Sequence, residues 1–175
     1  MLPIQLVSKF IKILRSAASP SQIAGGFILG FLLGMSPSLL SLLNLFIILL
    51  IIILNINLAT ALFAFALFSA FAYLMDPFFH SLGFALLVDV QSLKSVWTFL
   101  YNTPFIPFTR FNNTVVMGSL SISLILLFPL YFLTKRFVVI YREKYEPRVK
   151  NWKWVKLLKS SQIYQMYERL KFLGE

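Results

Sequence analysis

Long apolar runs occupy the middle of the chain, and short polar peptides separate one run from the next. Ser19-Pro20, Ser36-Pro37 and Asp76-Pro77 each place a good N-cap residue before a proline, which is favourable at the first position of a helix. Asn55-Ile56-Asn57 adds a turn. The pattern therefore predicts four apolar helices. They cover residues 20–35, 37–54, 58–75 and 111–134.

The segments outside these runs mix apolar and charged positions. Residues 4–18 predict an amphipathic helix, because Lys9, Lys12 and Arg15 share one face while apolar side chains occupy the other. Such a helix lies in the membrane interface. A cleaved signal peptide fits less well, because basic residues interrupt its apolar run. Residues 77–103 also combine charged and apolar side chains, so we expect a second interfacial segment there.

The composition indicates that these helices belong to a membrane protein. Hydrophobic residues make up 59% and charged residues 13% of the 175 residues, whereas a soluble domain carries about 25% charged residues. The chain is therefore predicted to be an all-α integral membrane protein. We expect an interfacial helix at residues 1–18, a polytopic membrane domain at 19–134 and a basic cytoplasmic tail at 135–175.

The distribution of charge predicts the orientation. No Lys or Arg occurs from Ser16 to Leu93, whereas the chain from Lys135 onward carries eleven basic and four acidic residues. Basic ends around an apolar middle indicate that both termini are cytoplasmic. Lysines beside a membrane span more often meet anionic lipid headgroups than nucleic acid, so membrane lipids are the expected partner and no nucleic-acid partner is expected.

The first apolar helix is short for a membrane span. Its 16 residues, 20–35, reach about 24 Å at ~1.5 Å per residue, less than the roughly 30 Å of the hydrocarbon core. A single broken crossing by residues 20–54 would leave the basic tail outside, against the charge bias. A helical hairpin that turns at Ser36 and Pro37 keeps both termini inside. This hairpin either spans fully or re-enters, and the sequence favours the re-entrant form only slightly.

Gly26, Gly30 and Gly34 recur every four residues and form a bare ridge on the first apolar helix. Such ridges let a second helix approach until the two backbones touch. Helix packing is therefore the expected role of these glycines, and a smooth wall for a sliding lipid is the alternative.

Polar residues gather near the ends of the last two apolar helices. Asp76 and His80 are four residues apart, which places them on one helix face. Arg110, Asn112 and Asn113 precede the last helix. One hypothesis unites these five residues in a non-cytoplasmic polar site for a lipid headgroup or a proton, because charged groups near hydrocarbon need partners. The alternative is separate local roles, such as helix capping by Asp76, Asn112 or Thr114.

Catalytic signatures are missing. The chain has no cysteine and one histidine, and it lacks G-x-x-x-x-G-K-[ST], H-E-x-x-H and G-x-S-x-G. The sequence therefore predicts a non-enzymatic protein with no catalytic residue, no metal and no cofactor.

Several stretches resemble a known bacterial membrane family, the domain of unknown function 2062. Ser19-Pro20-Ser21-Gln22-Ile23-Ala24-Gly25-Gly26 and the residues to Ser36-Pro37 resemble its opening motif. Asp76-Pro77-Phe78-Phe79-His80 and Thr109-Arg110-Phe111-Asn112-Asn113-Thr114 resemble a narrower subfamily of small stand-alone members. The resemblance covers about residues 10–145, although Pro37-Ser38-Leu39-Leu40 lacks the glycine of the family's Pro-x-x-Gly turn.

What the resemblance implies is a bacterial inner-membrane protein. Some relatives are fused to glycosyltransferases that use lipid carriers, and the genes of the small members lie in neighbourhoods beside those of large envelope-spanning proteins. We therefore expect an accessory or partner subunit in phospholipid or lipid-carrier handling. A small-solute or ion transporter that uses Asp76, His80 and Arg110 is the main alternative, and an enzyme acting on lipid phosphates is the third.

Overall fold

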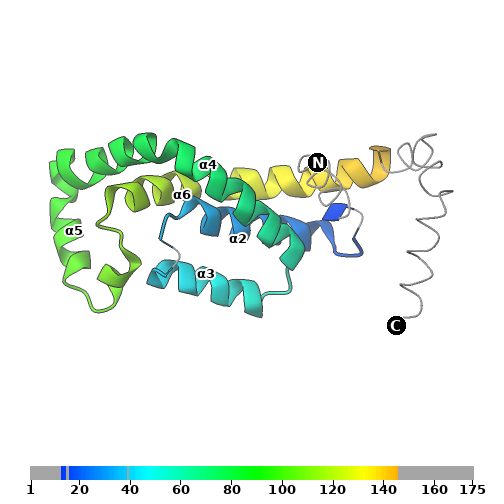
Figure 1. Cartoon of the computed structure of the whole chain (residues 1–175), viewed down its shortest axis with the longest axis horizontal. Helices are drawn as coiled ribbons and strands as arrows, with labels where there is room; N and C mark the ends of the chain where they lie inside the picture. The colour runs from blue at the N-terminus through cyan, green and yellow to red at the C-terminus, as the bar shows by residue number, and fades with distance from the viewer. Residues whose placement is uncertain (1–12, 15, 39, 146–175) are drawn as a thin grey trace.

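Every regular element of the described chain is helical. The computed structural model describes residues 13–14, 16–38 and 40–145, and within these residues there is no strand. The prediction of an all-α protein is therefore confirmed for this part of the chain. The α-helices are α2 (Pro20–Met35), α3 (Leu42–Ile53), α4 (Leu58–Phe84), α5 (Lys94–Tyr101) and α6 (Thr114–Ile140) (Figure 1). The shorter elements are η1 (Ala85–Asp89), η2 (Gln91–Leu93), η3 (Ile106–Thr109) and η4 (Tyr141–Tyr145).

Two helices dominate the length of the molecule. α4 continues into η1 as Leu58–Asp89, and α6 continues into η4 as Thr114–Tyr145, each with 32 residues. Both are long and apolar enough to cross a membrane, since 32 residues of helix extend about 48 Å. Many of their large apolar side chains are exposed, including those of Leu74 and Phe128, as expected for surfaces that face lipid.

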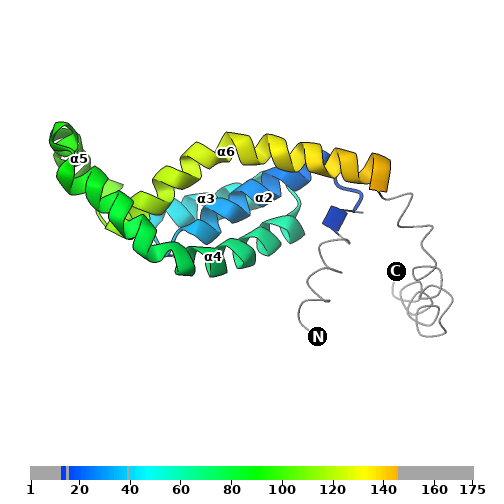
Figure 2. The same cartoon turned by 90° about the horizontal axis from the view of Figure 1, so that it is seen from above.

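α2 lies at the centre of the molecule. It packs against both α4 and α6, and Figure 2 shows it between them. Nine of its sixteen residues are buried, whereas α3 buries only Asn44 and Ile47. α3 runs back alongside α2 at the edge of the molecule (Figure 1).

The long helices give the molecule two distinct ends. One end, here called the α5 end, holds residues 90–113 with α5 and η3 (Figure 1). The opposite end, here called the terminal end, holds residues 13–14 and 16–18, the turn at 54–57 and η4 (Figure 1). The described chain therefore enters and leaves at the same end.

Two predicted helix starts are corrected by the structure. Asp76-Pro77 does not begin a helix, because α4 runs without interruption from Leu58 to Phe84 with Pro77 inside it. A proline in a helix removes one backbone hydrogen bond, and an apolar environment still favours continuing the helix over exposing further backbone groups. The predicted interfacial segment at 77–103 accordingly begins as the last eight residues of α4.

The start of α3 is the second correction. Ser36 is the C-cap of α2, and α3 begins at Leu42 rather than at Pro37. Ser41 is the N-cap, since its hydroxyl accepts a hydrogen bond of 3.3 Å from the Asn44 backbone N–H. The serine nearer to the apolar run thus caps the helix.

The described residues include only part of the two segments predicted at the chain ends. The interfacial helix predicted at 4–18 lies largely outside the described residues. Most of the basic tail does so as well, since the description ends at Tyr145. Residues 135–145, which the sequence assigns to the tail, continue the last long helix through α6 and η4.

Candidate functional site

The glycine ridge of α2 lies directly against the backbone of α4. A Cβ atom on Gly26 or Gly30 would collide with the backbone carbonyl oxygens of Asn57 or Ala61, respectively. A Cβ atom on Gly34 would lie 2.7 Å from the carbonyl oxygen of Phe65. The ridge therefore faces protein rather than lipid, and α2 and α4 touch through their main chains along this seam.

A second glycine crossing joins α4 to α6. A Cβ atom on Gly83 would collide with the carbonyl oxygen of Thr114, and one on Gly118 would collide with that of Phe79. The two collisions are reciprocal, so they fix the register of α4 against α6. No sequence pattern predicts this crossing, because each helix contributes a single glycine and no repeat marks it.

The residues of the predicted polar site are spread along this crossing. His80 Nδ1 lies 2.6 Å from Thr114 Oγ1, which joins α4 to the start of α6. Asp76 is half-buried one helical turn before His80, and Arg110 is exposed in the loop before α6. Among the described residues, neither Asp76 nor Arg110 forms a side-chain hydrogen bond or an ion pair. The structure thus brings His80 to α6 but does not bring Asp76 to Arg110.

Register explains this separation. Gly83 pairs with Thr114, so Arg110 lies beyond the Gly83 level while Asp76 lies about two turns before it on α4. The α6 N-cap is Asn113, whose Oδ1 accepts hydrogen bonds from the backbone N–H groups of Val115 at 2.9 Å and Val116 at 3.2 Å. Asn112 instead lines a pocket with α5.

A large apolar groove opens at the terminal end, and we call it the terminal groove. Its volume is about 510 Å³. α2 contributes Ile23 and Phe27, α4 contributes Thr60, and the second half of α6 contributes most of the remaining wall. The α6 wall includes Leu130, Leu133, Thr134, Arg136 and Phe137. Arg136 is the one charged side chain among the described residues that line it.

Ile13 and Leu14 form the N-terminal wall of the terminal groove, and Arg142 holds this wall in place. Its Nε donates to the carbonyl of Leu14 at 2.9 Å, and its Nη2 donates to those of Ser16 and Ala18 at 2.9 and 2.8 Å. The planar fork of the guanidinium suits several acceptors at once. No sequence signal predicts this contact, because its partners are backbone atoms more than a hundred residues away.

The turn between α2 and α3 contains buried polar groups. The amide of Asn44 donates to the carbonyl of Ser38 at 2.7 Å, while Asn44 Oδ1 and Ser36 Oγ have no partner among the described residues. Ser119 and Ser123 of α6 are buried beside this turn and line a cavity of about 10 Å³ with Ser36. A cavity of this size admits one water molecule, which would give the Ser36 hydroxyl a partner.

The described residues therefore define an all-helical protein with two helices that are long and apolar enough to cross a membrane. No group of three His, Asp or Glu side chains suited to a metal occurs in this part of the chain. Residues 5–146 match the model of a family described as an uncharacterised protein conserved in bacteria, the domain of unknown function 2062. The chain belongs to this family, as its motifs predict. No curated protein and no solved structure matches it.

Proposed function

We propose that this protein is a non-enzymatic, multi-pass protein of the bacterial inner membrane that binds lipid as an accessory subunit in lipid handling. The observation that carries the proposal is the terminal groove. A pocket of 300–1,000 Å³ that is mostly apolar, with few polar groups, is typical of a ligand site. An acyl or polyprenyl chain has the shape and chemistry that this groove accepts.

Charge selects the headgroup in this proposal. Arg136 lines the groove, and Arg142 and Lys144 follow it in η4. Basic side chains next to a membrane attract anionic headgroups, by about 1 kcal/mol each near the surface. The occupant is therefore an anionic lipid whose chain lies in the groove and whose phosphate lies near Arg136.

Orientation follows from the same charges. With the terminal end on the cytoplasmic side, both termini are cytoplasmic, and the hairpin of α2 and α3 enters from that side. The helices have 16 and 12 residues and extend only about 24 and 18 Å, short of the roughly 30 Å of the hydrocarbon core. The turn also lies beside Ser119 and Ser123 of α6, part-way along that helix, which supports a re-entrant hairpin.

A large envelope-spanning protein completes the proposal as the partner, on the strength of the family resemblance. Affinity purification from native membranes, followed by lipid and protein mass spectrometry of one sample, tests both associations. We expect an anionic lipid and one large envelope protein to co-purify.

The groove itself is tested with a phospholipid that carries a photoreactive group on its acyl chain. Leu133→Trp narrows the groove, whereas Leu124→Trp makes the same change on an exposed face of α6 outside it. We expect Leu133→Trp to reduce labelling of peptides from α2 and the second half of α6 about fivefold or more, and Leu124→Trp to leave it unchanged. Equal labelling of the two variants would show that lipid contacts α6 only as bulk membrane.

Arg136 provides a second, independent comparison. Arg136→Gln removes the charge that lines the groove, and Lys135→Gln removes the neighbouring exposed charge that does not. Loss of preference for anionic over zwitterionic photolipid in Arg136→Gln alone supports the headgroup assignment. The same loss in both variants would indicate a diffuse surface effect and contradict it.

A further inference from the structure

A second pocket lies at the α5 end, far from the terminal groove, and we call it the α5 pocket. Its volume is about 380 Å³, and it is polar as well as aromatic. The side chains that matter for its chemistry come from α5 and from the residues on either side of the loop that follows. They are Lys94, Trp97, Tyr101, Asn102, Phe111 and Asn112.

Trp97 builds the rigid wall of this pocket. Its Nε1 donates to the carbonyl of Leu86 at 2.9 Å, which ties α5 to the end of α4 through η1. Its ring lies against that of Phe111, with centroids 6.2 Å apart, and Phe111 is buried. Because the indole N–H is already bonded and the ring is held in place, the wall is formed before any ligand arrives.

The polar side of the α5 pocket is suited to an anion. Lys94 and Arg110 are the only Lys or Arg residues between Arg15 and Lys135, and Lys94 lines the pocket. Asn102 and Asn112 line the same pocket and carry amide donors. No described Asp or Glu side chain lines it, so the pocket presents hydrogen-bond donors and one positive charge without an opposing carboxylate. This donor set suits the oxygens of a phosphate ester.

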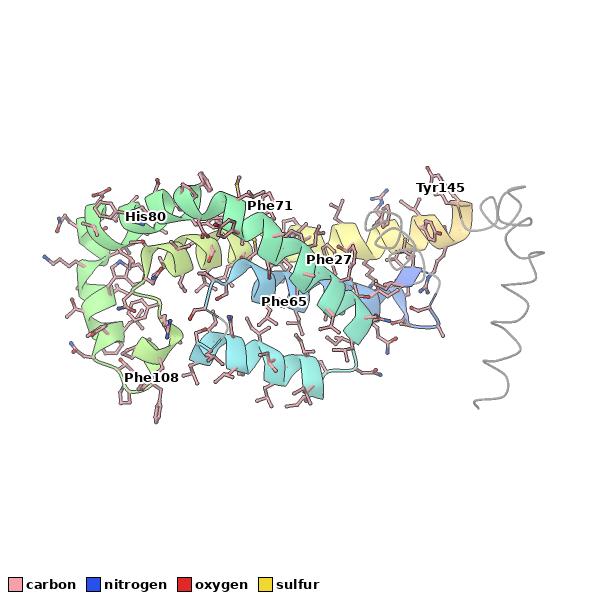
Figure 3. The ribbon with its side chains drawn as sticks, viewed as in Figure 1. Phe27, Phe65, Phe71, His80, Phe108 and Tyr145 are labelled. Carbon is pink, nitrogen blue, oxygen red and sulfur yellow. The ribbon has the colours of Figure 1, made fainter. Side chains whose placement is uncertain are left out.

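Exposed aromatic side chains surround the same end. Phe99, Phe105 and Phe108 are 71%, 71% and 68% exposed, and Phe108 projects from the loop in Figure 3. Aromatic residues are enriched at the level of the headgroups in membrane proteins. The α5 pocket therefore lies where the phosphate of a lipid would reach it.

We propose that the α5 pocket binds a phosphate ester, the headgroup of a phospholipid in the leaflet opposite the terminal groove. Lys94 neutralises the phosphate, the amides of Asn102 and Asn112 donate to its oxygens, and the Trp97 ring packs against the glycerol carbons. The assignment goes beyond the lipid groove and does not depend on it, because the two sites share no residue.

Trp97 makes the pocket directly observable. The chain has three tryptophans, so replacing Trp152 and Trp154 of the tail by Phe leaves Trp97 as the only indole. The full-length protein in zwitterionic detergent and phosphate-free buffer is titrated with dihexanoyl phosphatidylglycerol or with glycerol 3-phosphate. We expect a saturable change in Trp97 fluorescence. Binding of the lipid at least tenfold more tightly assigns the site to phospholipid, and equal binding assigns it to a soluble phosphate ester.

Lys94→Gln is the decisive variant, and Lys135→Gln at the terminal end is its matched control. Loss of a charge-assisted hydrogen bond should weaken binding about tenfold in Lys94→Gln and leave it unchanged in Lys135→Gln. Lys94 is exposed, so both variants should keep the helical circular dichroism and the melting temperature of the parent. Absence of a saturable response to either probe, or identical titrations of the parent and Lys94→Gln, would overturn the proposal. Leu133→Trp should leave these titrations unchanged, so a failure of the terminal groove and a failure of the α5 pocket are distinguishable.

Discussion

Gly30 and Gly118 have the same role at two different helix crossings. Each lies where the carbonyl group of a neighbouring helix occupies the space of a Cβ atom. Spacing alone predicts the α2 ridge, because three glycines at intervals of four residues leave one helix face bare. It cannot predict the α4–α6 crossing, since Gly83 and Gly118 become partners only once the two helices are paired. A repeated glycine spacing within one helix is therefore visible in the sequence, whereas a contact between single glycines of two helices is not.

Alanine substitution measures both crossings. Gly30→Ala and Gly118→Ala each force a methyl group against a backbone carbonyl, and we expect each to lower the free energy of unfolding by about 1–3 kcal/mol. Gly25→Ala is the matched control, because its Cβ would meet only the Ile56 side chain, at 3.1 Å, and alanine is the better helix former. Thermal unfolding in detergent checks the comparison. Equal melting temperatures for the three variants would show that the crossings are looser than described.

Arg142 is the residue whose role depends most on its chemical type. Arg142→Lys keeps the charge, but a single ammonium group cannot reproduce the fork that reaches three carbonyl groups. We expect the free energy of unfolding to fall by about 1–3 kcal/mol and amide exchange to become faster in residues 13–14 and 16–18. Arg136→Lys, at an exposed position without a described hydrogen bond, is the control. Unchanged exchange in Arg142→Lys would mean that the N-terminal wall of the groove is held by other contacts.

At the scale of elements, caps were predictable where a polar residue has no competitor. Ser19 begins α2 as predicted, in a capping box with Gln22, and Asn57 begins α4 after the predicted turn. Ser36-Pro37 and Asp76-Pro77 carry the same signal but do not begin helices. In the first case Ser41 caps α3 instead, and in the second the surrounding apolar run continues through the proline. A capping residue before a proline therefore indicates a local preference to begin a helix, and the environment of the whole helix can override this preference.

The hairpin of α2 and α3 gives the element-scale prediction. Leu40, 84% exposed at its turn, should lie within the bilayer if the hairpin re-enters. In this cysteine-free chain, Leu40→Cys should then resist membrane-impermeant thiol reagents from either side of the membrane. Ser95→Cys, on exposed α5, should react from outside and serves as the control. Reaction of Leu40→Cys from outside would show instead that the hairpin spans the membrane.

At the scale of the molecule, the two ends differ in charge and in the chemistry of their pockets. The terminal groove combines residues that are distant in sequence, such as Ile23, Thr60 and Leu133. The α5 pocket likewise needs α5 folded back beside the start of α6. The charge asymmetry could be predicted because it depends only on the positions of charged residues along the sequence. Both pockets depend on tertiary packing. The sequence could therefore predict an orientation but neither pocket.

That orientation is tested with a single cysteine in the basic tail. Gln165→Cys should be protected from an impermeant thiol reagent in intact cells and should react once the cells are opened, because basic segments are retained in the cytoplasm. Ser95→Cys should show the opposite behaviour. Labelling of Gln165→Cys in intact cells would reverse the assignment of the two ends.

The central place of α2 has a consequence for biogenesis. Among the described helices, α2 leaves the ribosome first, yet it packs against α4 and α6, which are made later. The glycines of α2 have their packing partner only once α4 is made. The polar turn that follows α2 is covered only once Ser119 and Ser123 of α6 are in place. Because synthesis proceeds from the N-terminus, the hairpin of α2 and α3 is made before α6, and its polar turn stays uncovered until α6 packs against it. A chain that stops before α6 would therefore leave the buried polar groups of this turn without the α6 side chains that cover them.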